Sequence, residues 1–541
     1  MARIFCIGDV NTDLFLYTDE TPVPGTEKGV GEINTTIGGN AANTAMALGH
    51  LGADVTLISA TGKDTAADFI KKELKKAKVK TIFLPSKKPT GTSVIFVTKT
   101  GERGIMSNKG ALLDISIKAI LNVLPNGLRK QDIIYFGGYY HLPQVRKGFE
   151  KLLEKIKVKE TKIFFDTTYD EYGKWEVKKI LPKTNIFFTN TTELEKITKK
   201  RNIDSAAKWL IKNGAKKVVV KKGKHGAAYY AKNEKIEDNA ISSHAVNSTG
   251  AGDFFTAGFT YAKSKLWGNK TCLVCGNFIA GKKIQSKEYY EPKIQELELH
   301  LKKTNLAQLK KINNKKQIEM EIVQNLKCQL KMKKNSVLAL ASGHTPIGVY
   351  KEIAKQYRAG KIDFSEAYFL ELDEYLNTKK SNTFKEYFKN NLLSKVNFKK
   401  NRIIMFDSET NWLEQKKKIE KFIHSHSIDL MLLGIGKNGH LAFNEPGTGF
   451  ESKIHIAKLT KTTIKSNKKE LSGKIPKEAI TLGLKTIVES KKIIVTATGK
   501  SKAIAVKKAT KEKATESVPA SILQKHRNAI FIVDKAAGKF V

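Results

Sequence analysis

The residue types best suited to chemistry gather in one glycine-rich stretch, residues 434–446. It holds Asn438, His440 and Glu445, and it follows the apolar run 428–433. An apolar run bounded by glycine indicates a buried parallel strand, and open α/β sheets bind ligands at the turns that follow such strands. His440 could transfer protons near neutral pH while Glu445 orients it and balances its charge. The alternative is an ordinary loop whose histidine is satisfied by local hydrogen bonds.

Three further strand ends in the same half carry groups that could hold a phosphate or move a proton. Gly343 and Thr345 follow the apolar strand expected over 336–341, and a glycine turn that opens a helix can cradle a phosphate. Lys502 follows another such strand and offers a positive charge. Asp373 ends a third strand, and its carboxylate could act as a general base if it is desolvated. The alternative for Asp373 is a solvated acidic loop.

The first half has a comparable stretch, residues 247–253, ahead of an apolar helix expected over 254–262. Backbone N–H groups at a helix start form an anion hole that suits a phosphoryl group in transfer. Asp253 beside it could take the proton from an attacking hydroxyl. A helix N-cap turn with an acidic first turn is the alternative. Near the N-terminus, Asp13 belongs to a group of two carboxylates and an amide that could bind sugar hydroxyls.

These groups need a scaffold, and the hydrophobic pattern predicts one. The strands expected in the first half alternate with helices, which implies a parallel, doubly wound sheet. They lie at residues 4–8, 54–60, 132–136, 162–166 and 185–189. A strand at 92–98 falls outside this order and predicts a side sheet or lid, together with residues 14–36. The strand–turn–helix order recurs in the second half, so we expect a second α/β domain of the same class.

A chain of 541 residues is too long for a single core. We expect domains at 1–285 and 309–541, joined by a charged linker over 286–308. Hydrophobic residues make up 40%, which suffices for globular folding. Cys272 and Cys275 form a C-x-x-C pair, but they lie in an apolar, helical stretch with no second pair. Core packing is therefore favoured over a metal or redox role.

The formal net charge of +43 raises the question of a nucleic-acid partner. The basic residues are nearly all lysine and are spread over the whole length, whereas base readout and phosphate clamping favour arginine. We therefore expect a basic surface rather than a nucleic-acid function. No apolar run approaches the roughly 18 residues that span a membrane, and the N-terminus lacks the apolar core of a signal peptide. A soluble cytoplasmic protein is predicted.

Four motifs of the first half, taken in order, resemble the ribokinase-like sugar kinases of the phosphofructokinase-B type. They are Gly-Gly-Asn-Ala-Ala-Asn at 38–43, Asn-Thr-Thr-Glu at 190–193, Val-Lys-Lys-Gly-Lys-His-Gly-Ala at 220–227 and Thr-Gly-Ala-Gly-Asp at 249–253. The resemblance implies a ribokinase-like fold with a small β lid, ATP and Mg²⁺ as cofactors, and Asp253 as the catalytic base. The other implied residues are Asp13, Gly39 and Asn43 for the sugar, Asn190, Glu193, Lys221, Gly223, Gly226, Thr249, Gly250, Ala251 and Gly252 for ATP and its phosphates, and Glu193, indirectly, for Mg²⁺.

The second half resembles glucosamine-6-phosphate deaminase from about residue 310 to residue 541. The motifs are the stretches 342–346, 372–375, 434–446 and 499–502, and the Asn-Glu-Pro at 444–446 is absent from the related 6-phosphogluconolactonases. The resemblance implies a Rossmann-like deaminase fold in which His440 opens the sugar ring and Asp373 moves a proton from C2 to C1. The remaining implied residues are Asn438 and Glu445, which orient and tune His440, and Gly343, Thr345, Lys469 and Lys502, which hold the 6-phosphate.

Together the two resemblances predict a bifunctional enzyme of aminosugar catabolism. The kinase would phosphorylate an aminosugar such as glucosamine, and the deaminase would convert glucosamine 6-phosphate to fructose 6-phosphate and ammonia. Two alternatives stay open: the kinase acts on another sugar or on fructose 6-phosphate, or one half is a degenerate sugar-phosphate sensor. The expected partners are small-molecule sugars and sugar phosphates, with neither a membrane nor a nucleic acid among them. A homo-oligomer through the deaminase half is compatible with the resemblance.

Overall fold

The computed structural model describes residues 2–18, 24–27, 29–98, 103–157, 161–241, 245–286, 289–408, 411–460, 463–464 and 476–541. The chain divides into two compact units, residues 1–302 and 303–541. Among the described residues, no helix is long and apolar enough to cross a membrane.

The first unit is built on a nine-stranded sheet with the order β13-β12-β11-β10-β9-β8-β1-β4-β5. Its strands are β1 (Arg3–Ile7), β4 (Asp54–Ala60), β5 (Lys80–Leu84), β8 (Ile133–Phe136), β9 (Lys162–Asp166), β10 (Ile186–Asn190), β11 (Lys217–Lys221), β12 (Ala227–Ala231) and β13 (Glu234–Asp238). Strand β12 pairs antiparallel with both β11 and the edge strand β13, and the other neighbouring strands are parallel. The central strands are buried on both faces, which is why they show continuous apolar runs in the sequence. The predicted doubly wound class is confirmed.

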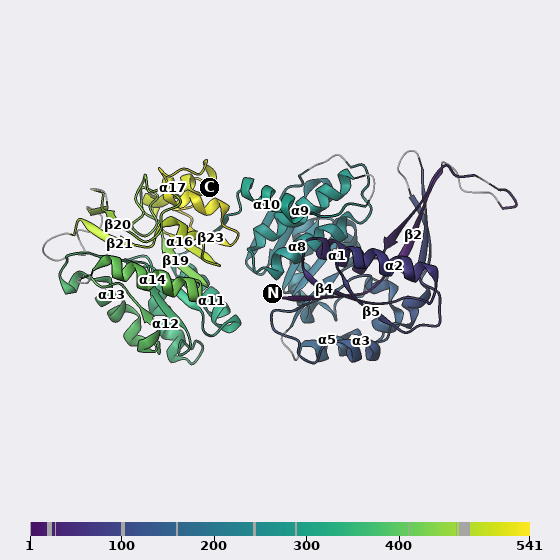
Figure 1. The fold of residues 1–541 in the computed structure, drawn as a ribbon, viewed down its shortest axis with the longest axis horizontal. Helices are drawn as coiled ribbons and strands as arrows, with labels where there is room; N and C mark the ends of the chain where they lie inside the picture. Colours follow the sequence, from purple (N-terminus) through teal and green to yellow (C-terminus); the bar gives the residue numbers. More distant parts are fainter. Residues whose placement is uncertain are drawn as a thin grey trace. The chain divides into compact units, whose positions relative to one another are not determined.

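Helices cover both faces of this sheet. On one side lie α3 (Ile117–Val123), α5 (Phe149–Lys157), α6 (Thr191–Thr198) and α7 (Ile203–Lys212), whose apolar residues share a core with the strands. On the other side lie α1 (Asn40–His50), α2 (Thr65–Lys76), α8 (Ala251–Ser264) and α9 (Asn269–Gln285) (Figure 1). Cys272 and Cys275 are buried in α9.

A separate four-stranded sheet with the order β3-β2-β6-β7 forms the predicted lid. Its strands are β2 (Asn11–Tyr17), β3 (Ile33–Gly38), β6 (Thr92–Val97) and β7 (Arg103–Asn108). Figure 1 shows β2 reaching beyond the main sheet of this unit, past α2. Because β2 begins soon after β1 ends and β3 leads into α1, the base of the lid lies where these elements meet the main sheet.

The second unit holds a seven-stranded parallel sheet with the order β14-β23-β22-β19-β15-β16-β18. Its strands are β14 (Gln308–Ile312), β15 (Val337–Leu340), β16 (Tyr368–Glu371), β18 (Ile403–Ile404), β19 (Leu430–Gly434), β22 (Ile493–Ala497) and β23 (Ala529–Asp534). A smaller sheet joins β17 (Asp373–Tyr375), β21 (Glu478–Thr481) and β20 (His455–Lys458).

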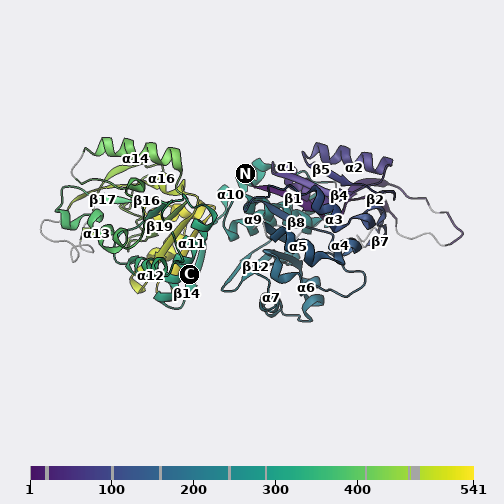
Figure 2. The same cartoon turned by 90° about the horizontal axis from the view of Figure 1, so that it is seen from below.

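Two sets of helices enclose the seven-stranded sheet. One set is α11 (Lys315–Met332), α12 (Ile347–Arg358) and α13 (Phe384–Asn391), and the other is α14 (Trp412–His426), α16 (Leu484–Val488) and α17 (Ala503–Lys511). Figure 2 shows α14 and α16 on one side of β19 and α11 and α12 on the other. Both faces of the sheet are thus buried, as the apolar strand pattern predicts.

The range expected to link the halves, residues 286–308, contains regular structure. Helix α10 (Ile294–Lys303) lies within it, with Leu297 and Leu301 buried, and β14 begins at its end. The many charges of this segment lie on the exposed side of a short amphipathic helix, and they obscured its apolar positions in the sequence. The compact units meet at residues 302 and 303, so most of α10 belongs to the first unit.

Candidate active sites

In the first unit, Asp253 lies in the first turn of α8. Gly250, just before the helix, has a φ of 72°, a left-handed conformation that favours glycine. The buried Asp253 carboxylate accepts hydrogen bonds from Asn40 Nδ2 at 2.6 Å and Asn43 Nδ2 at 3.1 Å, both on α1. Burial raises the pKa of Asp253 to about 8. A raised pKa makes the ionised carboxylate a stronger proton acceptor, which suits a general base.

The turn before α8 leaves N–H groups for an anion. The N–H groups of Thr249 and Ala251 are engaged inside the turn, Thr249 by Asn247 Oδ1 at 3.0 Å. Those of Gly250 and Gly252 donate to no acceptor in the described part of the chain. Unpaired N–H groups at a helix start attract negative charge, so the geometry agrees with the predicted anion hole.

Lys221, the last residue of β11, lies beside this turn. A β-carbon built on Gly252 would be 3.5 Å from Lys221 Nζ. That Nζ donates to both oxygens of Asp166, at 2.8 and 2.9 Å, and Asp166 also accepts a hydrogen bond from Thr256. Burial opposes the charge of Lys221, but the carboxylates of Asp166, Glu193 and Asp253 together outweigh burial and raise the pKa of the lysine. A fixed positive charge therefore adjoins the turn.

Asn190 and Glu193 form a capping box at the start of α6. Asn190 Oδ1 accepts from the Glu193 N–H at 2.8 Å, and Glu193 Oε2 accepts from the Asn190 N–H at 3.0 Å. Thr167 Oγ1 also donates to Glu193 Oε2, at 2.5 Å. In the described part of the chain, Glu193 Oε1 accepts no hydrogen bond, so one oxygen is left for a water bound to Mg²⁺. The predicted Mg²⁺ role is compatible with this arrangement.

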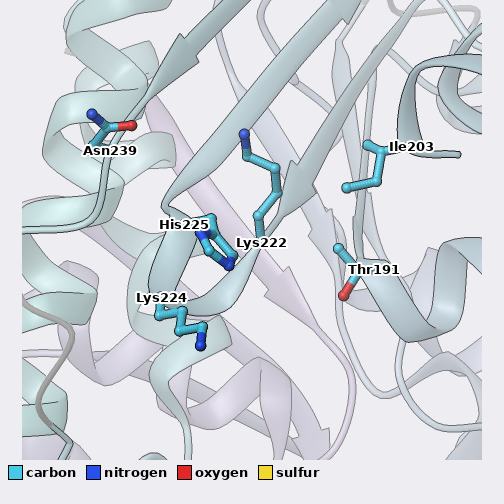
Figure 3. A pocket seen from close by; sticks show the side chains of 6 residues that line it. All are labelled: Thr191, Ile203, Lys222, Lys224, His225 and Asn239. Carbon is cyan, nitrogen blue, oxygen red and sulfur yellow. The ribbon is translucent and has the colours of Figure 1, made fainter.

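The loop between β11 and β12 borders a cavity of about 650 Å³. Gly223 and Gly226 give the loop its shape, with φ values of 56° and 77°. A β-carbon on Gly226 would lie 2.1 Å from the Asp238 carbonyl oxygen, so only glycine fits there. Figure 3 shows the side chains around the cavity, which are Thr191, Ile203, Lys222, Lys224, His225 and Asn239. Volume and basic lining both suit a nucleoside triphosphate, the ligand predicted for this loop.

The predicted sugar-binding residues lie at the base of the lid. Gly39 has a φ of 99°, and a β-carbon there would come within 2.6 Å of the Asp9 carbonyl oxygen. Asp13 lies over the neighbouring Gly38, and its Oδ1 accepts a hydrogen bond from Asn11 Nδ2 at 2.5 Å. Burial raises the pKa of Asp13 to about 6. Gly39 opens α1, the helix that carries Asn43, so these residues and Asp253 belong to one region.

In the second unit, the four predicted strand ends come together. Strands β22, β19, β15 and β16 are consecutive neighbours in a parallel sheet. Parallel strands end at the same edge, so the turns after all four adjoin one another. Lys502 Nζ donates to the Ile435 carbonyl at 2.6 Å, which joins the turn after β22 to the stretch 434–446, called the histidine loop below.

His440 is held within the histidine loop by Glu445. His440 Nδ1 lies 3.5 Å from Glu445 Oε2, which also accepts a hydrogen bond from Asn438 Nδ2 at 2.7 Å. Thr463 Oγ1 donates to Glu445 Oε1 and lies 3.4 Å from His440 Nδ1. Burial alone would raise the pKa of Glu445, but its three partners, His440 foremost, lower it to about 2. Glu445 is therefore ionised and can balance a charged imidazole. A β-carbon on Gly436 would lie 2.5 Å from the imidazole, so glycine is required there.

Asp373 begins β17, just past the end of β16. Its side chain is only 6% exposed, and burial together with the neighbouring Glu374 raises its pKa to about 8. Glu374 is held by the first turn of α13, where it accepts the N–H groups of Phe384 and Lys385 at 2.9 and 3.0 Å. Asp373 is thus a desolvated carboxylate, as a carbon-acid base must be, and the solvated acidic loop is excluded.

Short hydrogen-bonded links join the Asp373 strand to the histidine loop. The Leu482 N–H donates to the carbonyl of the residue before Asp373 at 2.8 Å, and the Leu482 carbonyl accepts from Asn444 Nδ2 at 2.8 Å. Thr481 lies opposite Asp373 in the ladder of β17 and β21, and its Oγ1 accepts the Phe443 N–H at 3.2 Å. The proton-abstracting and ring-opening candidates therefore share one framework.

The predicted phosphate-binding residues are described in part. Gly343 has a φ of 89°, and its carbonyl accepts a hydrogen bond from Tyr387 Oη at 2.6 Å. Thr345 is half-buried in the same turn, ahead of α12. Burial, together with nearby positive charge, lowers the pKa of Lys502. Lys469 lies outside the described residues.

The model of the pfkB family carbohydrate kinases matches residues 1–296, and that of the glucosamine-6-phosphate isomerases and 6-phosphogluconolactonases matches residues 313–532. A glucosamine-6-phosphate deaminase of Clostridium botulinum (strain Kyoto / Type A2) is 42% identical over 235 residues, 42% of this chain and 95% of that protein. The chain belongs to both families.

Solved structures match each half separately. Ribokinase of Thermotoga maritima is 25% identical, with a TM-score of 0.48 over 56% of this chain and 100% of its own. A monomeric glucosamine-6-phosphate deaminase is 30% identical, with a TM-score of 0.42 over 43% of this chain and 100% of its own. The family matches establish both enzyme classes: the chain is a carbohydrate kinase joined to a glucosamine-6-phosphate deaminase.

Two residues of these sites were not singled out from the sequence. Asn40 makes the shorter of the two hydrogen bonds to Asp253, and its place inside the motif at 38–43 was a signal that could have identified it. Thr463 bridges Glu445 and His440, but it lies in a lysine-rich segment without a recognisable motif. Only the folded chain brings Thr463 to the histidine loop.

Proposed function

We propose that the two halves catalyse consecutive steps. The kinase transfers a phosphoryl group from ATP to the 6-hydroxyl of an aminosugar such as glucosamine. The deaminase then converts glucosamine 6-phosphate and water to fructose 6-phosphate and ammonia. The observation that supports the deaminase roles most strongly is the buried, ionised Glu445 beside His440.

In the kinase half, Asp253 accepts the proton of the acceptor hydroxyl while Asn40 and Asn43 fix its carboxylate. The free N–H groups of Gly250 and Gly252 stabilise negative charge on the transferred group. Mg²⁺, when bound, offsets charge on the phosphates of ATP, and the free oxygen of Glu193 would hold it through water. The cavity beside the loop 223–226 receives the nucleotide.

In the deaminase half, His440 gives a proton to the ring oxygen and accepts one from the C1 hydroxyl, which opens the sugar ring. Glu445 stabilises the charged imidazole during that exchange. Asp373 then removes the proton from C2 and returns it to C1, so that the amine-bearing carbon becomes an imine, which water hydrolyses to the ketone and ammonia. Gly343, Thr345 and Lys502 hold the 6-phosphate, with Lys469 as the fourth proposed contact.

The acceptor end of the kinase site supports an acceptor without a phosphate. Asp9, Asp13 and Asp253 place three carboxylates there, and a sugar phosphate would bring further negative charge among them. A neutral or cationic sugar is therefore favoured over fructose 6-phosphate. This order of reactions makes the kinase the supplier of the deaminase substrate.

A panel of sugars with MgATP tests the proposal, with ADP and ammonia followed separately in the full chain. Glucosamine should give ADP, and should give ammonia only when ATP is present. Asp253→Asn should abolish ADP formation and leave ammonia release from added glucosamine 6-phosphate unchanged, because its site is built from other residues. If no ammonia formed from glucosamine 6-phosphate, the proposed deaminase activity would be wrong. If Asp253→Asn lost both activities, the proposal that the two reactions have separate sites would be refuted.

A further inference from the structure

Two of the three carboxylates at the acceptor end of the kinase site have compensating partners. Asp9 Oδ2 lies 2.9 Å from His141 Nδ1, and Asp9 Oδ1 accepts the Ala41 N–H at 3.0 Å. Asp253 is held by two amides, and the positive charge of Lys221 favours its ionised form. Asp9 is therefore satisfied by its own partners, whereas Asp253, whose pKa burial still raises to about 8, faces the reacting hydroxyl as the proposed base.

Asp13 is different. Its Oδ1 accepts a hydrogen bond from Asn11, but it makes no ion pair with any residue that the structure describes. Burial is the main cause that raises the pKa of Asp13, the nearby Asp9 adds like charge, and the hydrogen bonds from Asn11 and Ser93 offset only part of this cost. A half-buried carboxylate in this situation binds a cation more favourably than it binds a neutral hydroxyl.

The position of Asp13 places this charge on the same stretch of chain that holds the base. The Asp13 carboxylate lies over Gly38, since a β-carbon there would come within 2.3 Å of its atoms. Asn40, two residues further on, holds Asp253 at 2.6 Å. Two residues of chain span roughly 7 Å at most, a length comparable to a hexose ring with its substituents. Asp13 and the amide that holds Asp253 therefore flank one short stretch, residues 38–40, and a hexose bound over it would face both.

We propose that Asp13 is the specificity-determining residue of the kinase half, and that it pairs with the protonated primary amine of the acceptor sugar. The site then selects a sugar with a free ammonium group over the same sugar with a hydroxyl or an acylated nitrogen. A hydroxyl can donate one hydrogen bond to Asp13 but leaves its charge uncompensated, and an N-acyl group removes the positive charge and adds bulk. This inference rests on the proposed action of the kinase half on an aminosugar.

The test measures kcat/KM for ADP formation with glucosamine, glucose and N-acetylglucosamine in the full chain. An ion pair in a partly buried site is worth about 10- to 100-fold in selectivity, so the wild type should prefer glucosamine over glucose by that factor. Asp13→Asn keeps the shape and hydrogen-bonding capacity without the charge, and should reduce the preference to within about threefold. The loss should come mainly from a higher KM for glucosamine. Asp68→Asn is the matched control, because Asp68 is an exposed carboxylate on α2 and its removal should leave the ratio unchanged.

Ammonia release from glucosamine 6-phosphate reports whether each variant chain is folded, and Asp13→Ser provides a second uncharged variant. An equal fall of kcat/KM for glucosamine and glucose in both variants would overturn the inference, because Asp13 would then serve only as a hydroxyl ligand. A wild type that prefers glucose to glucosamine would overturn it without any variant. Failure of the proposed function is a separate result: a wild-type chain that forms ADP with neutral sugars and with no aminosugar.

Discussion

Replacing Glu445 with Gln tests how His440 is activated, because the change keeps the shape of the side chain and removes its charge. The contacts of Glu445, His440 first, lower its pKa from the usual 4.5 to about 2 against the effect of burial. That lowering corresponds to about 3 kcal/mol of interaction with the ionised carboxylate. The neutral amide can keep hydrogen bonds to Asn438 and Thr463, and His440 is 22% exposed, so water screens part of the remainder. Removing the charge should therefore remove about 2 kcal/mol of this interaction, which lowers kcat roughly 30-fold.

The assay is ammonia release from glucosamine 6-phosphate, with Asn438→Ala as the comparison. Asn438 contributes one hydrogen bond to Glu445 and no charge, so its loss should cost about 1 kcal/mol, or roughly fivefold. If Glu445 acts through His440, then Glu445→Gln should add little to the defect of His440→Ala, because the interaction is already gone. The reasoning is refuted if Asn438→Ala is as damaging as Glu445→Gln, or if the Glu445 change slows the His440→Ala variant by the full 30-fold.

Three further predictions concern Asp373 and Thr463 in the same half. Asp373 must be ionised to act as a base, and its pKa is raised to about 8, so kcat/KM for the deaminase should rise with pH through about 8; a rise centred near pH 4 would contradict this. Because the pKa of Asp373 is raised in the folded chain, its contribution to stability is fully present below about pH 4 and is lost as the pH rises through about 8. The Asp373→Asn variant should therefore have a Tm a few degrees above that of the wild type at pH 9, and nearly the same Tm at pH 4. Thermal unfolding at the two pH values measures this difference. Thr463→Val is nearly isosteric and removes the hydroxyl that bridges Glu445 and His440, so deaminase kcat should fall about tenfold, while an unchanged kcat would show that Thr463 only fills space.

The sequence determined the local parts of each site. The apolar runs predicted β4 and β9 at the bounds that the structure has, because the alternation of buried and exposed positions along a strand is a local pattern. The Asn190 and Glu193 motif likewise determined a capping box, since its two hydrogen bonds join residues three apart.

The sequence pattern did not predict helix α10 and strand β14, because each has few apolar residues among many charged ones. Leu297 and Leu301 are the buried residues of α10. In β14, Lys310 and Lys311 interrupt a five-residue strand that is completed by pairing with β23, more than 200 residues away in the chain. Pairing over such a separation is decided by the assembled sheet, and the composition of the strand itself gives little indication of it.

Tertiary structure alone decided which partners each catalytic candidate meets. Asn40 and Asp253 are 213 residues apart in sequence and 2.6 Å apart in the fold. The order β22-β19-β15-β16 brings four strand ends to one edge, although their order along the chain is different. Thr463 reaches Glu445 from a segment whose sequence resembles surface lysine-rich loops. The sequence therefore specified which groups could react, because residue type and turn geometry are local, whereas their burial, pKa values and partners depend on contacts that exist only once the sheets have formed.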